Sequence, residues 1–205
     1  MHIAISGNIG SGKTTLTEKL AKHYGWKAEF EAVDNNPYLA DFYDDMKRWS
    51  FHLQVYFLNS RFNQINIIQN SNLSIIHDRT IYEDAYIFAA NLYKSNLISQ
   101  RDYDNYLSLF HSMINFVKAP DLLIYLKADI PKLVGQIEKR GRDYENAIRI
   151  DYLKNLNTHY EEWIANYDKG KLLIVDVNEM DFVANQEYFS AIVGQVDREI
   201  FGLFS

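Results

Sequence analysis

The stretch "GNIGSGKTT", residues 7–15, has the residue types and spacing that hold phosphate groups. It matches the Walker A pattern G-x-x-x-x-G-K-[ST] and follows a short apolar run typical of a strand. Glycines let backbone N–H groups turn toward phosphate oxygens, and the first turn of the following helix adds positive partial charge. We expect Lys13 to contact the outer phosphates and the Thr14 hydroxyl to bind Mg²⁺. The residues expected to bind the nucleotide in this loop are Gly7, Asn8, Ile9, Gly10, Ser11, Gly12, Lys13, Thr14 and Thr15.

Two common classes of nucleotide-binding protein do not fit the rest of the chain. A GTPase should carry Asn-Lys-x-Asp to bind guanine, but the nearest string is "LKAD" at residues 126–129, with Leu126 in place of asparagine. An adenylate kinase should have glycine after the lysine, where this chain has Thr14. The sequence therefore favours neither class.

Charged residues follow two further apolar runs. Glu31 ends the run at residues 27–31, and Asp78 and Arg79 follow the run at residues 73–77. A carboxylate near the phosphate loop could accept the proton of an attacking hydroxyl. An acid beside an arginine could hold Mg²⁺ and stabilise transferred charge. Taken by itself, Glu31 could equally be a solvated or helix-capping acid.

The amphipathic pattern that starts at Trp49 carries polar residues on one face. Gln54 and Arg61 are seven residues apart, which is about two helical turns. A glutamine amide both donates and accepts, so it matches the edge of an amino-bearing base. Asp84 could pair with Arg61 if their helices face each other. Without such contacts, Gln54 would lie on a solvated face and Asp84 would complement a helix dipole.

Strand-like and helical patterns alternate along the chain. We expect strands at residues 3–6, 27–31, 73–77, 122–126 and 172–175, and helices that begin near Lys13, Trp49, Tyr82, Tyr103, Pro131, Arg149 and Asn185. This alternation predicts an α/β fold with a mainly parallel sheet and helices on both faces. Ligands bind such sheets at the carboxyl ends of the strands. Lys127-Ala128-Asp129 ends the fourth strand without an assigned role, and we interpret most of the 15 tyrosines as core residues.

Composition limits the function classes. The 205 residues include 21 Lys and Arg against 27 Asp and Glu, a net charge of −6, which disfavours a large nucleic-acid face. The chain has no cysteine, so disulfides and thiolate metal sites are impossible. No apolar stretch is long enough for a membrane span, and the first residues read as a strand rather than a signal peptide. We expect a cytoplasmic protein that binds no nucleic acid polymer and no membrane.

Several segments together resemble the deoxynucleoside kinase family, which includes deoxycytidine, deoxyguanosine and bacterial deoxyadenosine kinases. The phosphate loop, "EAVDNNPYL", "FHLQVY", "DRTIYEDAYIFAANLY", "RGRDYE" and "VDVNEMDF" resemble family motifs in the same order, up to about Phe182. The resemblance implies one domain over residues 1–205 with a P-loop kinase fold. It also implies a five-stranded parallel sheet flanked by helices and a small lid at about residues 139–148.

The resemblance implies roles at the phosphate end of the site. Glu31 would be the base near the sugar 5′-hydroxyl, although Asp78 could instead accept the proton. Asp78 would contact Mg²⁺ and Arg79 would stabilise the transferred charge. Arg140 and Arg142 would hold phosphates from the lid.

It also implies roles along the nucleoside. Tyr43 and Glu145 would hydrogen-bond the 3′-hydroxyl, and Asp181 and Phe182 would lie near the donor adenine. The residues that would read the base are Gln54, Arg61 and Asp84. The apolar walls would come from Leu39, Phe42 and Phe88.

The chain departs from the family pattern at a few positions. Asp78 replaces a glutamate, so its metal contact could run through water. Ala32 replaces a proline, Thr80 replaces a serine, and Met180 adds one residue to the donor-base loop. None of these changes removes a group that the reaction needs.

The expected reaction is Mg²⁺-dependent transfer of the ATP γ-phosphoryl group to a deoxyribonucleoside 5′-hydroxyl. Glutamine with an Arg–Asp couple suits adenine or cytosine, and "DNNPYLADFY" resembles the bacterial deoxyadenosine/deoxyguanosine branch, so we favour deoxyadenosine. Deoxyguanosine and deoxycytidine stay open as main substrates. A nucleoside monophosphate kinase, which should have more basic residues for the acceptor phosphate, and a non-catalytic nucleotide-binding regulator also stay open. The family also implies a homodimer.

Overall fold

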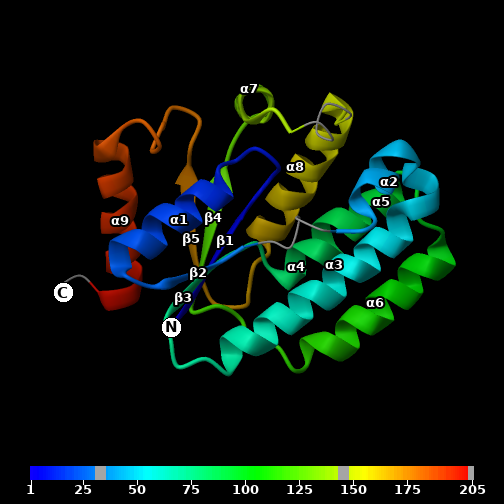
Figure 1. Ribbon diagram of the computed structural model, residues 1–205, viewed down its shortest axis with the longest axis horizontal. Coiled ribbons are helices and arrows are strands. Elements are labelled where there is room, and N and C mark those ends of the chain that lie inside the picture. Colours follow the sequence, from blue (N-terminus) through cyan, green and yellow to red (C-terminus); the bar gives the residue numbers. More distant parts are fainter. Residues whose placement is uncertain (31–35, 143–147, 203–205) are drawn as a thin grey trace.

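Five parallel strands form one sheet in the computed structural model, which describes residues 1–30, 36–142 and 148–202 (Figure 1). The strands lie in the order β2-β3-β1-β4-β5, which confirms the predicted five-stranded parallel sheet. Their bounds are β1 (His2–Gly7), β2 (Lys27–Glu29), β3 (Ile75–Asp78), β4 (Leu122–Lys127) and β5 (Lys171–Asp176).

Each strand differs from its predicted range by one or two residues at one end or both, and the differences at β2 and β3 bear on the site. β3 begins at Ile75 rather than at residue 73, because Leu73 lies exposed in the preceding turn, and it extends to Asp78. β2 ends at Glu29, and Glu31 lies outside the described residues.

The helices start close to the predicted residues. The sequence does not predict the short helix α2 or the π-helical turn η1, which interrupts the helix after β3. The helical elements are α1 (Lys13–Tyr24), α2 (Leu39–Asp44), α3 (Met46–Gln69), α4 (Ile81–Glu83), η1 (Asp84–Ala89), α5 (Ala90–Lys94), α6 (Gln100–Ile114), α7 (Ile130–Arg140), α8 (Ile150–Ala165) and α9 (Gln186–Phe201).

The two faces of the sheet are covered by different helices. Ile3 and Ile5 of β1 belong to a buried cluster with residues of α1, α7 and α9. Ala4, between them, belongs to a second cluster with residues of η1 and α8. This alternation follows from the period of two in a strand. Figure 1 shows α1 and α9 on one side of the sheet and α8 on the other.

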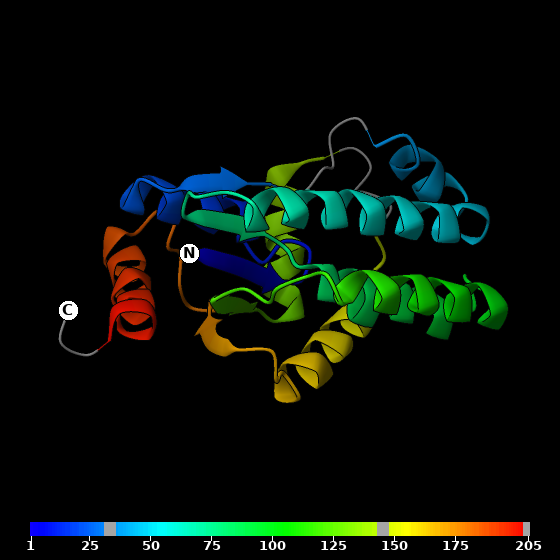
Figure 2. The ribbon, with the colours of Figure 1, turned by 90° about the horizontal axis from the view of Figure 1, so that it is seen from below.

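A further helical layer lies beyond η1. α3 and α6 run side by side away from the sheet (Figure 2), and their contacts include Leu58 and Phe110 in a buried cluster with η1. α2 packs on α3 through Phe42 and Leu53. This layer places Gln54 and Arg61 of α3 opposite Asp84 of η1.

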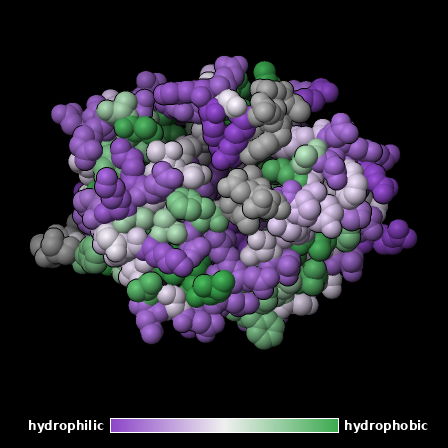
Figure 3. Space-filling model, in the orientation of Figure 1, coloured by the Kyte–Doolittle hydropathy of each residue, from purple (hydrophilic) through white to green (hydrophobic). Residues whose placement is uncertain are grey.

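The residues after β4 begin a helix. Asp129 accepts a hydrogen bond from Lys132 N at 2.9 Å and so caps α7, which gives "LKAD" a structural role. Figure 3 shows hydrophobic residues in separate patches among hydrophilic ones on the viewed face. Within the described ranges, no helix combines the length and apolar character needed to cross a membrane.

Candidate active site

β1 and β3 end side by side, because Ile5 pairs with Asp78 in the parallel register. The phosphate loop leaves β1 at the same edge where Asp78 closes β3, and a cavity of about 280 Å³ opens there. Its lining carries both acidic and basic groups, together with aromatic walls. The lining residues are Ile9, Gly10, Lys13, Thr14, Glu18, Phe30, Leu39, Phe42, Tyr43, Leu53, Gln54, Phe57, Asp78, Arg79, Asp84, Phe88, Arg140, Arg142 and Tyr152.

The phosphate loop has the geometry that its glycines predict. Gly12 caps α1 with φ of 96°, a left-handed conformation that favours glycine. The Lys13 ammonium donates to the Asn8 carbonyl at 3.0 Å, so it lies over the loop. The first turn of α1 and this ammonium together make the loop an anion-binding site.

Two helices, α7 and α8, hold the phosphate loop. The Asn8 amide donates to the Leu153 carbonyl at 3.0 Å and to Asn157 Oδ1 at 2.7 Å, both on α8. On the α7 side, a Cβ at Gly10 would come within 2.7 Å of the Leu133 carbonyl oxygen, so only glycine fits this approach. α7 ends at Arg140, so the helix that packs against Gly10 also carries this arginine.

Thr14 and Asp78 form the part of the site that fits a magnesium ion. The Thr14 hydroxyl donates to Asp78 Oδ2 at 2.6 Å. Asp78 is 2% exposed, and its Oδ1 is buried with no hydrogen-bond partner among the described residues. Magnesium binds hard oxygen ligands and keeps several waters. A hydroxyl and a carboxylate beside a phosphate loop match that preference.

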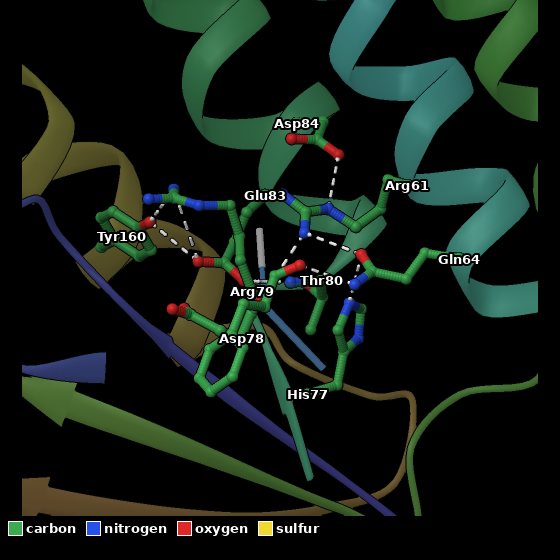
Figure 4. A network of polar contacts seen from close by, with 10 residues as sticks. Arg61, Gln64, His77, Asp78, Arg79, Thr80, Glu83, Asp84 and Tyr160 are labelled. Atoms are coloured by element: carbon green, nitrogen blue, oxygen red, sulfur yellow. Dashed lines mark hydrogen bonds and ion pairs between the residues drawn. The ribbon is translucent and has the colours of Figure 1, made fainter. Parts of the chain in front are cut away.

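Arg79 follows Asp78 in an unusual backbone conformation. Its φ is 74°, and its N–H donates to the Ile5 carbonyl at 2.9 Å. Its guanidinium donates to the Tyr160 hydroxyl at 3.2 Å (Figure 4). It also lies 4.4 Å from the centre of the Phe88 ring. The cation is therefore buried at the wall of the cavity, next in the chain to Asp78.

The far end of the cavity carries polar groups suited to a base. Gln54 is 3% exposed, and its Oε1 has no hydrogen-bond partner within the described part of the chain. Asp84 Oδ2 lies 3.3 Å from Arg61 Nε, which confirms the predicted pairing across α3 and η1. Arg61 also donates to the Asp78 carbonyl at 3.2 Å.

Gln64 connects this arginine to His77 of β3 (Figure 4) and to Phe30, which follows β2. Its Oε1 accepts from Arg61 at 3.4 Å and lies 3.0 Å from His77 Nε2, while its Nε2 donates to the Phe30 carbonyl at 2.7 Å. Burial, with a smaller effect of Arg61, holds the pKa of His77 well below its usual value. His77 is therefore neutral, and its Nε2–H is the donor to Gln64.

The cavity brings together most of the residues predicted for the site. Arg61 is buried and is not among the lining residues, although it contacts Asp84, which is. Glu31 and Glu145 lie outside the described residues. The other predicted residues that line the cavity are Ile9, Gly10, Lys13, Thr14, Leu39, Phe42, Tyr43, Gln54, Asp78, Arg79, Asp84, Phe88, Arg140 and Arg142.

Asp181 and Phe182, which the sequence predicts to lie near the donor adenine, are not among the residues that line this cavity. Phe182 is buried, and a Cβ at Gly12 would come 3.0 Å from its ring, so it supports the phosphate loop from the other side. Asp181 accepts from the backbone N–H groups of Val183 and Ala184, and the bond from Ala184 lowers the pKa of its carboxyl. These contacts shape the loop in which the donor adenine is predicted to bind.

Sequence reasoning missed several residues around the cavity. Tyr152 lines it, and Tyr160 bonds Arg79, although the sequence predicts core roles for most tyrosines. Burial raises the pKa of Tyr152, so its hydroxyl stays protonated. Thr80 and Glu83 form a capping box at the start of α4. The spacing Thr-x-x-Glu before an apolar run is a readable signal for this cap. The other missed lining residues are Glu18, Phe30, Leu53 and Phe57.

Comparisons with known proteins agree with this geometry. A model of the deoxynucleoside kinase family matches residues 3–201. The chain is 39% identical over 196 residues to a deoxyadenosine/deoxycytidine kinase of Bacillus subtilis, covering 95% of this chain and 90% of that one. It is 40% identical over 196 residues to a deoxyadenosine kinase of Dictyostelium discoideum, covering 96% and 79%.

A solved structure is similar over almost its whole length. It is the deoxyadenosine kinase of M. mycoides with dCMP and a flexible dCDP bound, with a TM-score of 0.87 and 32% identity, covering 96% of this chain and 99% of that one. The family match spans most of the chain, and the phosphate loop, the buried acid–arginine pair and the polar cavity are all present. The chain therefore belongs to the deoxynucleoside kinase family and is a phosphotransferase that acts on a deoxynucleoside.

Proposed function

We propose that the protein transfers the γ-phosphoryl group of ATP to the 5′-hydroxyl of a deoxynucleoside and that it prefers deoxyadenosine. The observation that carries this preference is the buried Gln54 Oε1, which has no hydrogen-bond partner among the described residues. A buried acceptor without a donor is costly, so a ligand that supplies an N–H gains affinity. Adenine offers an exocyclic amine beside a ring nitrogen acceptor, and a glutamine amide matches both groups.

Cytosine also carries an exocyclic amine beside a ring acceptor, so deoxycytidine is the second candidate. The B. subtilis relative is named for both nucleosides. Guanine presents a carbonyl at the corresponding position, and thymine presents a carbonyl and a methyl group. A carbonyl opposite Gln54 Oε1 would leave two acceptors facing each other, so we expect both nucleosides to be poorer substrates than deoxyadenosine.

Phosphoryl transfer depends mainly on positioning and charge neutralisation. Lys13 and Arg79 both line the cavity together with Asp78 and would neutralise the moving group. Arg140 and Arg142 would approach the phosphates from the other wall. Thr14 and Asp78 would hold Mg²⁺, which when bound neutralises phosphate charge.

The remaining roles follow the family assignment. Glu31 would accept the proton of the 5′-hydroxyl, with Asp78 as the second candidate for this role. Glu145 and Tyr43 would bind the 3′-hydroxyl, and closure of the lid at residues 139–148 would exclude water. Asp181 and Phe182 would lie near the donor adenine. We also propose a homodimer located in the cytoplasm, where ATP and deoxynucleosides are both available.

A substrate panel tests the proposal. The purified protein would be incubated with ATP and Mg²⁺ and with each of the four deoxynucleosides and their monophosphates, and initial rates would be measured over a range of acceptor concentrations. The expected result is the highest kcat/KM with deoxyadenosine, a lower value with deoxycytidine, and no transfer to monophosphates. A higher kcat/KM with deoxyguanosine or thymidine would contradict the assignment of Gln54.

A further inference from the structure

We propose that Glu83 and Tyr160 are positioning residues for phosphoryl transfer, which act by holding the Arg79 guanidinium in its reactive orientation. The inference rests on the role proposed above for Arg79. It assigns a function in turnover to a buried tyrosine on α8 and to a carboxylate that also begins α4. Neither residue lines the cavity, so both act through Arg79.

The backbone of Arg79 needs external support. A φ of 74° is uncommon for a residue other than glycine and strains the backbone. Such a conformation persists only where surrounding contacts determine it. The backbone conformation of Arg79 lets the chain turn between Asp78, which is proposed to bind the metal, and Thr80, which caps α4.

Glu83 uses its two carboxylate oxygens for two different tasks (Figure 4). Oε2 accepts from Thr80 N at 2.7 Å and from the Thr80 hydroxyl at 3.0 Å, which is the capping box. Oε1 accepts from the Tyr160 hydroxyl at 2.8 Å and lies 3.9 Å from the Arg79 guanidinium. A capping box needs only the first set of bonds. The second set joins the carboxylate to Arg79.

Tyr160 is the link between the anion and the cation. Its hydroxyl donates to Glu83 and accepts from Arg79, so both hydrogen-bonding capacities face this pair. Burial, with a further effect of the Glu83 charge, raises the pKa of Tyr160 well above its usual value, which keeps the donor in place. Glu83 and Tyr160 are both fully buried, where hydrogen bonds to charged groups are strong and directional.

The Arg79 guanidinium is contacted both at its edge and on its face. Tyr160 and Glu83 hold one edge, and the Phe88 ring, which lines the cavity, lies against its face. Loss of the Tyr160 hydroxyl would let the guanidinium swing within the cavity wall. A misplacement of about 1 Å in a group that stabilises transferred charge can cost up to about 10²-fold in rate.

Removal of one hydroxyl tests the inference. Tyr160→Phe keeps the buried ring, and Tyr125→Phe is the matched control. Tyr125 is equally buried, its ring stacks on Tyr160 with a centroid distance of 5.8 Å, and its hydroxyl donates to Glu161 instead. We expect Tyr160→Phe to lower kcat by between about 10- and 100-fold, with KM for the nucleoside changed less than about threefold. Tyr125→Phe should leave both constants close to those of the unaltered protein.

A double substitution separates positioning from a purely structural role. If Tyr160 acts through Arg79, adding Tyr160→Phe to Arg79→Met should lower kcat no further. A second variant, Glu83→Gln, keeps the size of the side chain and removes its charge, so it should also lower kcat more than Tyr125→Phe does. It keeps the inference testable if Tyr160→Phe does not fold.

Three results would overturn the inference. They are a kcat for Tyr160→Phe equal to that of Tyr125→Phe, a further loss of kcat when Tyr160→Phe is added to Arg79→Met, and an unchanged kcat for Glu83→Gln. Normal turnover of Arg79→Met alone would instead remove the role proposed for Arg79, and the inference with it. The first three results leave that role intact, so the two failures are distinguishable.

Discussion

The Thr14 hydroxyl donates to Asp78 Oδ2 across 2.6 Å and joins the start of α1 to the end of β3. These residues come from separate motifs, the phosphate loop and the acid–arginine pair. Their contact follows from the parallel register in which β1 and β3 end together. It leaves Asp78 Oδ1 as a buried oxygen available to a cation.

Asp78→Asn should raise the Mg²⁺ concentration needed for half-maximal activity. The amide removes the charge that fits the ion, and loss of a carboxylate at such a site should cost at least about tenfold in metal affinity or activity. The measurement is initial rate against Mg²⁺ at saturating ATP. Asp176→Asn, at the end of β5 and outside the cavity, is the control and should leave the Mg²⁺ curve unchanged. An Asp78→Asn curve that superimposes on that of the control would remove Asp78 from the metal site.

Glu31→Gln should lower kcat by roughly 10²-fold, the scale expected for loss of a general base. The measurement is kcat across pH 5–9, together with that of Asp78→Asn. The variant that lacks the proton acceptor should lose the acidic limb of the profile. Glu29→Gln, at the end of β2, is the control. Wild-type turnover in Glu31→Gln would transfer the role of proton acceptor to Asp78.

Gln54→Ala should reduce kcat/KM for deoxyadenosine by between about 5- and 150-fold, because a buried hydrogen-bonding partner is worth about 1–3 kcal/mol. KM for ATP should stay constant, since Gln54 lies at the far end of the cavity from the phosphate loop. Gln69→Ala is the control on the same helix, where the side chain bonds Phe116 and Lys118 instead. Unchanged nucleoside kinetics in Gln54→Ala would contradict the base-reading assignment.

Stability should fall on acidification partly because of His2. Burial lowers the pKa of His2 to about 4, with Asp121 opposing the effect, while the unfolded chain takes up the proton near pH 6.5. Between these two pH values the unfolded state binds more protons than the folded state. The neutral His2 therefore does not destabilise the fold above about pH 6.5, and the free energy of unfolding decreases as pH falls from there toward 4. The expected loss from this residue between pH 7 and pH 5 is about 1–2 kcal/mol in the free energy of unfolding.

Urea unfolding at pH 7 and pH 5 measures this loss. In His2→Phe part of the pH dependence should disappear, whereas His111→Gln, which replaces an exposed histidine on α6, should keep it. The buried His77 lies beside His2, with a ring distance of 5.7 Å, and accounts for the part that remains. Equal pH dependence in both variants would contradict the assignment to His2.

The sequence alone predicted the sheet, most of the helices and the phosphate loop. Buried parallel strands read as continuous apolar runs, and the glycine pattern of the loop has a strict local requirement. The pairing of Arg61 with Asp84 was predictable only on the condition that their helices face each other, which the structure shows.

Features that depend on tertiary packing were not predictable in the same way. α2 is only six residues long, too short for a periodic pattern. The π-helical turn at Asp84 has no local signature and re-aims the side chains of this segment. Tyr160 has the helical spacing of any core residue. Its contact with Arg79, 81 residues earlier, exists only because α8 packs against η1, the helical turn that follows β3 and α4.

Arg61 donates both to Asp84, which we propose contacts the nucleobase, and to the carbonyl of Asp78, which we propose binds Mg²⁺ beside the phosphates. Any substitution of this arginine made to accommodate a different base would also disturb the backbone that carries Asp78 and Arg79. Substitutions of Arg61 that change the preferred nucleoside should therefore also lower kcat. The carbonyl oxygen of Gln54 has no hydrogen-bond partner among the described residues. We therefore expect substitutions of Gln54 to change which nucleoside is preferred with little effect on kcat.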